Sequence, residues 1–228
     1  MAFIQGVLER MKFCVLIPSF NEEKTIGWLV KAVRENGFDV IVIDDGSKDK
    51  TAKFARENGA EVVVNKRNLG KGASLRKAFS LLAQKDYDAI ITMDGDGQHL
   101  PTDIAPFIER YTQEKPGIIV GNRMVKAKGM PLVRWLTNKF MSSVLSKLCK
   151  KSIPDSQCGF RLIDTKVLRE MNLSTENFEI ESEMLLEAAK NGYTIESIPI
   201  TTIYEGQYSA IHPFKDTVRF LKFVFGRR

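Results

Sequence analysis

The first 93 residues alternate between short apolar runs and longer stretches with the apolar spacing of a helix. The apolar runs lie at 13–17, 40–43, 61–64 and 88–93. Strands that alternate with helices through short connections form βαβ units, and these build a parallel sheet with helices on both faces. Ligands bind such a sheet beyond the carboxyl ends of its strands. The chain is therefore expected to have an α/β fold with one functional rim.

The intervening helices are expected at 22–36, at 49–58 and from the Gly70-Lys71-Gly72 loop to about 84. Asn21 is expected to cap the first helix and Gly37 to end it. The second half is less regular. Its expected helices cover 101–113, 131–150, 179–191 and 213–226, and its expected strands lie at 118–121, within 155–163 and at 194–204. The 131–150 helix carries one apolar stripe, made of Val133, Leu136, Phe140, Val144 and Leu148.

No internal repeat or linker interrupts the chain, so one domain is expected over residues 1–228, with 1–11 as an N-terminal extension. The three cysteines lack paired spacing and zinc-site companions, which indicates a reducing, cytosolic compartment. No stretch approaches the ~20 apolar residues that span a bilayer, and residues 1–11 do not have the pattern of a signal peptide. The expected location is cytoplasmic, including the cytoplasmic face of a membrane.

The chain has a net charge of +6 and an isoelectric point of about 9.2. This charge fits anionic partners such as nucleotides, phosphates or an acidic membrane surface. Nucleic acid is not an expected partner, because the basic residues are dispersed and no recognition-module signature is present.

The loop after the fourth apolar run contains Asp94-Gly95-Asp96-Gly97-Gln98-His99. Two carboxylates one residue apart at a strand end supply hard oxygen ligands for a divalent cation, which completes its coordination with water and phosphate. An EF-hand is excluded, because its sixth and twelfth positions would be His99 and Ala105 instead of Gly and Glu. Phosphatases of the haloacid-dehalogenase type place their acidic pair after the first strand, whereas this pair follows the fourth.

Two other loops supply polar groups at the same rim. Asp44-Asp45-Gly46-Ser47 fits either a turn that caps the next helix or carboxylates that accept hydrogen bonds from a base or ribose. Lys71 between two glycines suits a nucleotide phosphate. The loop lacks the Walker spacing, and no G-x-G-x-x-G follows the first strand, which argues against a dinucleotide oxidoreductase.

Cationic and imidazole groups complete the candidate set. Arg123 ends a strand at the rim, and Arg134 shares a helical face with Asn138 at i, i+4, so together they are suited to a second anion. His99 is expected to order the metal loop rather than to perform acid–base chemistry, and His212 is isolated.

With these residues placed, the chain resembles the family-two glycosyltransferases of the GT-A fold, a Rossmann-like architecture with a mostly parallel central sheet. Within them it is most similar to the dolichol-phosphate and polyprenyl-phosphate mannose synthases. The matching segments occur in the family's order between residue 13 and about 225: 17–22, 44–47, 68–72, 94–99, 121–123 and 155–161.

The resemblance implies three groups of site residues. The nucleotide pocket would be lined by Pro18, Ser19, Glu22, Asp44, Asp45 and Lys71. Asp94, Asp96 and Gln98 would hold Mg²⁺ or Mn²⁺ against the diphosphate of the nucleotide-sugar donor. Arg123, Arg134 and Asn138 would face the phosphate of a polyprenyl-phosphate lipid acceptor, and the aspartates and arginines would carry the catalysis.

The implied reaction inverts the anomeric configuration of a hexose, with mannose from GDP-mannose favoured over glucose from UDP-glucose. The cation would neutralise the departing nucleoside diphosphate, and an anionic acceptor needs positioning more than a base. If the acceptor were a sugar or lipid hydroxyl, a base would be required, and Asp155, Glu181 or Glu183 are candidates. A nucleotide-sugar-binding protein without turnover is the alternative from another class. A nucleotidylyltransferase is disfavoured, because the loop after the first strand is not glycine-rich.

Two features depart from the family pattern. The mannose synthases carry a Ser-Lys step before the C-terminal helix, whereas Ala210 stands at the lysine position here, and Lys215 or Arg219 are the candidate replacements. Many relatives carry C-terminal transmembrane helices, whereas this chain ends in a basic amphipathic segment, 213–228. That segment is expected either to pack on the core or to lie in a membrane interface as a peripheral contact.

Overall fold

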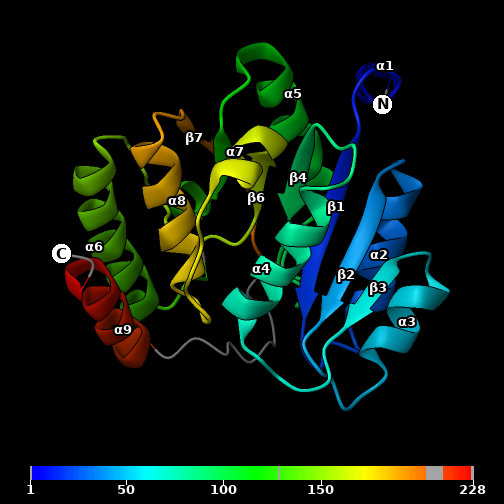
Figure 1. Ribbon diagram of the computed structural model, residues 1–228, viewed down its shortest axis with the longest axis horizontal. Coiled ribbons are helices and arrows are strands. Elements are labelled where there is room, and N and C mark those ends of the chain that lie inside the picture. Colours follow the sequence, from blue (N-terminus) through cyan, green and yellow to red (C-terminus); the bar gives the residue numbers. More distant parts are fainter. Residues whose placement is uncertain (1, 128, 204–212, 227–228) are drawn as a thin grey trace.

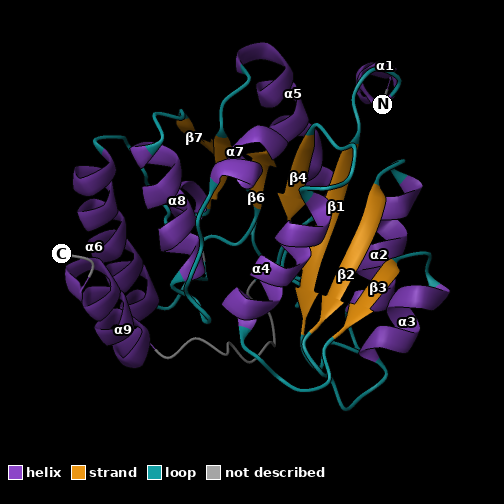
Figure 2. Ribbon diagram, viewed as in Figure 1, coloured by secondary structure: helices purple, strands orange, loops and turns teal. Residues whose placement is uncertain are grey.

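The computed structural model describes residues 2–127, 129–203 and 213–226. Their strands form a seven-stranded sheet in the order β3-β2-β1-β4-β6-β5-β7. Figures 1 and 2 show helices α4, α7 and α8 on one face of this sheet and α2 and α5 on the other. The expected α/β architecture, with a mostly parallel sheet covered on both faces, is confirmed.

The first half follows the predicted alternation closely. Its strands are β1 (Phe13–Ser19), β2 (Asp39–Asp44), β3 (Glu61–Val64) and β4 (Ala89–Thr92), all parallel to their neighbours among these four. Its helices are α1 (Ala2–Leu8), α2 (Ile26–Glu35), α3 (Thr51–Glu57) and α4 (Lys71–Leu82). The strands are parallel because each α-helical crossover returns the chain to the same edge of the sheet.

The predicted start of α2 is wrong. The N-cap of α2 is Thr25 instead of Asn21, and the helix begins at Ile26. Asn21 has a left-handed backbone with φ 57°, and its side-chain oxygen accepts from the Lys48 amide at 2.9 Å. Its polar side chain therefore joins two rim loops instead of capping a helix. Gly37 ends the helix as predicted, at φ 86°.

The second half contains the single antiparallel strand of the described sheet. β6 (Arg161–Asp164) lies between β4 and β5 (Ile118–Asn122) and runs antiparallel to both, while β7 (Ile195–Pro199) is parallel to β5. The helical elements are η1 (Pro101–Asp103), α5 (Ile104–Glu114), η2 (Met124–Lys126), α6 (Leu132–Cys149), α7 (Thr165–Glu170), α8 (Ile180–Lys190) and α9 (Pro213–Gly226). The predicted helices at 101–113, 131–150 and 179–191 correspond to η1 with α5, to α6 and to α8. The short helix α7 was not predicted.

Strand register brings the polar loops together. Ser19 pairs with Asp44 at the ends of β1 and β2, and Leu16 pairs with Thr92 in β4. The amide of Asp45 also donates to the Ser19 carbonyl at 2.9 Å. The carboxyl ends of three neighbouring strands therefore meet at one rim, as the sequence predicts.

The core is built from the sheet and from the inner faces of the helices. β1 and β4 are buried on both faces, which is the usual state of central parallel strands. Helix α6 packs inward with Met141, Leu145 and Cys149, so most of its predicted apolar stripe faces away from the core. Helix α9 packs against α6 through residues that include the buried Phe220.

Within the described residues, no helix combines the length and apolarity needed to cross a bilayer. The cysteines Cys14, Cys149 and Cys158 are buried and free. The expectations for His212 and for the 204–211 segment, which includes Ala210, lie outside the described residues, as does the side chain of Lys215.

Candidate active site

A cavity of about 370 Å³ opens at the rim where β1, β2 and β4 end. Ten of the twelve residues expected at the site line this one cavity, and they come from six different loops and helix starts. They are Pro18, Ser19, Glu22, Asp45, Lys71, Asp94, Asp96, Gln98, Arg123 and Arg134. The other two, Asp44 and Asn138, do not line it. The structure therefore brings ten of these residues together at one cavity, and their roles there remain predictions.

Lys71 is the electrostatic centre of the cavity. Its ammonium lies 2.6 Å from an oxygen of Asp94 and 2.7 Å from an oxygen of Glu181. Burial alone would lower the pKa of Lys71, but the two carboxylates outweigh it and raise this pKa above its ordinary value. Burial would likewise raise the pKa of Asp94, and the nearby Lys71 instead holds it well below the usual range. Lys71 and Asp94 are therefore both charged at neutral pH.

Asp96 and Glu22 also line the cavity. Neither forms an ion pair with Lys71, whereas Asp94 does. Burial and the neighbouring Asp94 raise the pKa of Asp96 to about 6. Burial and the charge of Asp96 raise the pKa of Glu22 to about 7. Clustered carboxylates that raise one another's pKa form a site that favours a cation.

The donor set fits a divalent cation that also contacts a ligand. The described residues contain no group of three or more His, Cys, Asp or Glu side chains placed to hold a metal ion. Asp94 and Asp96 with the Gln98 amide provide hard oxygen donors only, so a bound cation would need water or phosphate oxygens to complete its shell. Gln98 is buried, and its backbone amide donates to an Asp96 oxygen at 2.9 Å, which fixes the loop.

Glycines bring a second loop close to Lys71. A Cβ at Gly70 would lie 2.5 Å from the Glu176 carbonyl oxygen, and one at Gly72 would lie 2.6 Å from the Glu176 carbonyl carbon. Gly70 also has φ 94°, which favours glycine. The pattern Gly-Lys-Gly therefore allows close packing, and it places Asn177 and Phe178 on the cavity wall. Neither residue was predicted from the sequence.

The carboxylate of Asp45 organises this glycine loop. It accepts hydrogen bonds from the backbone amides of Leu69 and Gly70, each at 2.9 Å, and from the Asn65 side chain at 3.0 Å. Asp44 instead accepts from the Ser47 amide at 2.9 Å and is buried away from the cavity. Asp44 closes the turn, which is the structural alternative considered for this motif, so its placement on the nucleotide-pocket wall is corrected.

Arg123 is held by a buried carboxylate. Its Nε and Nη2 donate to the two oxygens of Asp155 at 2.8 Å each, and its backbone amide donates at 2.9 Å. Asn138 donates to the same carboxylate at 2.8 Å and accepts from the Ser142 hydroxyl. Asn138 is 3% exposed and lies behind Arg123, so its expected contact with an acceptor phosphate is corrected.

Each candidate base named from the sequence accepts from at least one donor, although Oε2 of Glu181 is buried without a hydrogen-bond partner among the described residues. Arg123 and its hydrogen bonds hold the pKa of Asp155 below its usual range, although burial opposes this. Glu183 accepts hydrogen bonds from the backbone amides and hydroxyls of Ser174 and Thr175. Glu181 pairs with Lys71. A carboxylate already committed to donors is a poor proton acceptor.

His99 has a structural role, in agreement with the sequence interpretation. It is 2% exposed, its ring lies 5.2 Å from that of Phe160, and burial lowers its pKa to about 4. Its Nε2 lies 3.9 Å from the Cys158 sulfur. A neutral, enclosed imidazole orders the loop and does not carry a charge at neutral pH.

The segment 155–161 packs directly against the acidic loop. A Cβ at Gly159 would lie 2.6 Å from an oxygen of Asp94. Arg161 is completely buried and donates to the carbonyls of Cys158, Ser156 and Glu181 at 2.6–2.8 Å. This arginine joins the segment to the start of α8, which is why Glu181 reaches Lys71.

The fold and the site define a class of α/β enzyme whose cavity combines paired carboxylates, a lysine and two arginines at the ends of parallel strands. The sequence pattern of "Glycosyl transferase family 2" matches residues 14–171, which is more than half of the chain. The chain belongs to this family.

Two relatives and one solved structure illustrate the similarity. The UDP-N-acetylglucosamine–dolichyl-phosphate N-acetylglucosaminyltransferase of Methanococcus voltae is 33% identical over 217 residues, covering 83% of this chain and 85% of the relative. The undecaprenyl-phosphate mannosyltransferase of Micrococcus luteus is 28% identical over 210 residues, covering 85% and 84%. Glucosyl-3-phosphoglycerate synthase of Mycobacterium tuberculosis, solved with Mn²⁺, UDP-glucose and phosphoglyceric acid, superposes with a TM-score of 0.79 at 16% identity, covering 99% and 82%. This last similarity establishes the GT-A fold.

Proposed function

We propose that this enzyme transfers a hexose from a nucleotide sugar to a polyprenyl phosphate with inversion, assisted by Mg²⁺ or Mn²⁺. One observation carries the proposal: carboxylates, a lysine and the two arginines Arg123 and Arg134 line one and the same cavity. Carboxylates that bind a cation suit a nucleoside diphosphate, and guanidinium groups suit a second phosphate. The cavity is therefore suited to two anionic substrates at once.

On the donor side, Pro18, Ser19, Glu22 and Asp45 would surround the nucleoside, with Asp44 supporting the turn from behind. Asp94, Asp96 and Gln98 would hold the cation, which when bound neutralises charge on the departing diphosphate. Lys71 lies next to Asp94 and would contact a phosphate oxygen. Its three N–H donors allow it to keep its bond to Glu181 while doing so.

On the acceptor side, Arg123 and Arg134 would position the phosphate, while Asp155 and Asn138 hold Arg123 in place. A phosphate acceptor is already anionic and attacks without a general base. The engagement of Asp155, Glu181 and Glu183 in structural bonds supports a phosphate over a hydroxyl acceptor. The names of the two relatives, which specify dolichyl and undecaprenyl phosphate, point the same way.

The proposal also extends to the sugar and the nucleotide base of the donor. The sequence resemblance favours mannose from GDP-mannose, with glucose from UDP-glucose next. The names of the relatives add N-acetylglucosamine from a UDP donor as a third candidate. A lipid acceptor also requires contact with a membrane surface, which we place on the cytoplasmic face.

A thermal-shift panel of GDP-mannose, UDP-glucose and UDP-N-acetylglucosamine, with and without Mn²⁺, tests the donor assignment, because a ligand stabilises the state that it binds. The matching donor should raise the melting temperature only when the cation is present. Asp96→Ala should abolish this metal-dependent part and leave a folded protein. Transfer of labelled sugar to a short-chain prenyl phosphate then tests the acceptor. Absence of a metal-dependent shift with every donor would contradict the proposal.

A further inference from the structure

Helix α6 exposes an apolar face that the described residues of the chain leave uncovered. Leu132, Val133, Leu136, Phe140 and Leu148 are between 48% and 69% exposed, although each is a large apolar side chain. They recur along one side of the helix over about 24 Å, at a rise of about 1.5 Å per residue. A continuous apolar patch of this length marks an interaction surface more often than a stray exposed residue does.

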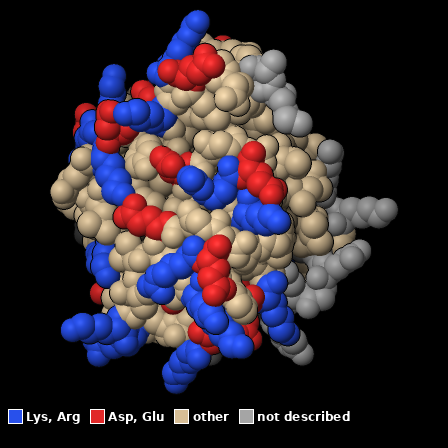
Figure 3. Space-filling model, turned by 90° about the vertical axis from the view of Figure 1, so that its right-hand side faces the viewer, with Lys and Arg blue, Asp and Glu red and all other residues tan. Residues whose placement is uncertain are grey.

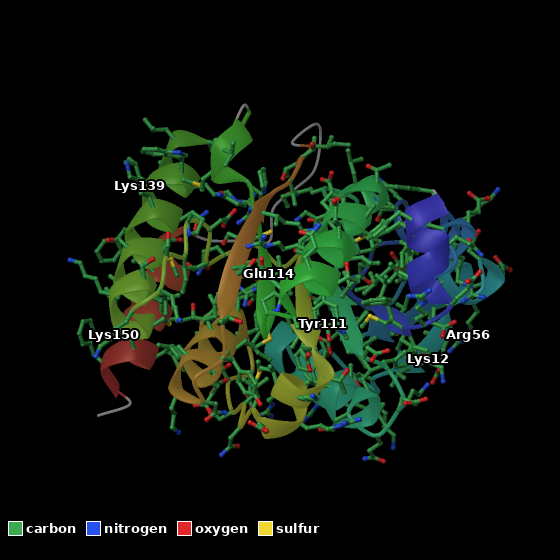
Figure 4. All side chains as sticks on the ribbon, turned by 90° about the horizontal axis from the view of Figure 1, so that it is seen from above. Lys12, Arg56, Tyr111, Glu114, Lys139 and Lys150 are labelled. Carbon is green, nitrogen blue, oxygen red and sulfur yellow. The ribbon has the colours of Figure 1, made fainter. Side chains whose placement is uncertain are left out.

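The segment that contains this helix carries charges of a single sign. Between Glu114 and Asp155 the sequence contains nine Lys or Arg residues and no Asp or Glu. Lys139, Lys147 and Lys150 are exposed beside the apolar stripe, and Figure 4 shows Lys139 and Lys150 on this side of the molecule. The Lys139 ammonium lies 4.7 Å from the centre of the Trp135 ring, a pairing of aromatic and cationic groups that suits a membrane interface. The opposite end of the molecule, around α2 and α3, mixes both signs (Figure 3).

The same helix reaches the cavity. Arg134, two residues after the start of α6, lines the cavity wall, while its neighbours Val133 and Leu136 face outward. Helix α9 packs against α6 (Figure 1), and its residues Val218 and Phe225 are also exposed. An apolar surface with a basic border therefore begins at the mouth of the cavity.

We propose that the outer face of α6, extended by α9, docks on an anionic lipid bilayer and sets the cavity mouth at the lipid surface. The inference rests on the proposed lipid acceptor, and it assigns the membrane contact mainly to α6. A bilayer fits both features of the face, because its acyl region accepts the apolar side chains and its anionic headgroups attract the lysines. A second copy fits poorly, because a two-fold contact would oppose like charges.

Vesicle sedimentation of the full chain tests the surface. The variant Leu136→Glu/Phe140→Glu replaces two residues that are 52% and 48% exposed and lie outside the buried core, so it should fold like the wild type. The matched control Phe3→Glu/Leu81→Glu makes the same chemical change at two exposed apolar positions away from α6, in α1 and α4. The wild type and the control should bind phosphatidylcholine vesicles that contain phosphatidylglycerol. The α6 variant should bind them roughly tenfold or more weakly, since two apolar anchors are lost.

The outcomes separate this surface from the enzymatic proposal. The α6 variant should keep the donor-induced thermal shift and the transfer to a water-soluble short-chain prenyl phosphate, because its cavity is unchanged. Equal vesicle binding by the α6 variant and the control, or no binding by the wild type, overturns the docking surface. A wild-type dimer in light scattering that the α6 variant converts to a monomer also overturns it, in favour of a second copy. If only the α6 variant loses vesicle binding, and neither the wild type nor the variants transfer sugar to a prenyl phosphate, the docking surface is supported and the proposed acceptor is refuted.

Discussion

Asp155 is expected to be among the most sensitive single positions for stability. Its carboxylate is completely buried and accepts four hydrogen bonds, three from Arg123 and one from Asn138. Asp155→Ala removes the carboxylate that accepts three hydrogen bonds from Arg123, a residue that is only 4% exposed. Breaking a buried ion pair from one side costs about 3–5 kcal/mol, a large part of the roughly 5–15 kcal/mol that stabilises a typical protein.

Urea unfolding followed by circular dichroism measures this loss. With a dependence of about 3 kcal/mol per molar urea, the midpoint should fall by roughly 1 M or more. The matched control is Asp86→Ala, which removes an ion pair of similar length, 2.7 Å to Lys12, whose side chains are 66% and 94% exposed. The urea midpoint of that control should stay close to that of the wild type, because an exposed ion pair contributes little to stability.

The double variant Arg123→Met/Asp155→Leu isolates the reason for the loss. It removes the buried charge together with its partner, so it should recover much of the stability lost in Asp155→Ala. If Asp155→Ala does not fold, Asp155→Asn allows the same comparison. Equal effects of the Asp155 and Asp86 substitutions would refute the reasoning.

Three further predictions concern the cavity. Glu22 and Asp96 have folded-state pKa values of about 7 and 6, above their ordinary values of 4.5 and 3.8. The folded state thus binds these protons more tightly, so the metal-free protein should lose stability as pH rises from about 5 to 8 in thermal melts, and Asp96→Asn should flatten the profile. Lys71→Met should increase the affinity of the nucleotide-free protein for Mn²⁺ roughly tenfold, because Asp94 loses a charged hydrogen bond. The same substitution should weaken the binding of a nucleoside diphosphate. Calorimetry that shows both affinities changing in the same direction would contradict this prediction. Gly159→Ala should weaken metal-dependent donor binding, because its Cβ would lie 2.6 Å from Asp94, whereas Gly6→Ala, with nothing within 4 Å, should not.

The strands and the rim could be predicted because both depend on local pattern. An apolar run followed by acidic or glycine-rich residues marks a strand end, and parallel topology then brings the ends together. The error at Asp44 arises at a finer scale. Asp44 and Asp45 are adjacent and chemically identical, and only the backbone direction at the end of β2 decides which one faces the cavity. Sequence pattern does not contain that direction.

Helix α6 shows a second limit. The stripe through Leu136 and Phe140 was visible in the sequence, but its burial depends on what packs against the helix. The face that packs inward includes Asn138, Ser142 and Cys149, which form a weaker apolar pattern. These small and polar residues are buried because they contact Asp155, Ser156 and α8. Polar contacts between distant segments therefore help to decide which face of this helix is buried.

The charge balance of the cavity joins the site residues into one argument. Five carboxylates line it, those of Glu22, Asp45, Asp94, Asp96 and Glu181, and Lys71 forms ion pairs with two of the five, Asp94 and Glu181. The sequence could not indicate the Glu181 pair, because its members lie on α4 and α8 and meet only in the folded chain. Glu22 and Asp96 have no such ion pair, so they bind protons more tightly than isolated carboxyl groups do. A bound divalent cation would offset the negative charge of these carboxylates in the same way as a proton does. The raised pKa values and the proposed affinity for a cation are therefore two consequences of one excess of negative charge. This excess lies on Asp96 and Glu22, because Lys71 already pairs with Asp94 and Glu181.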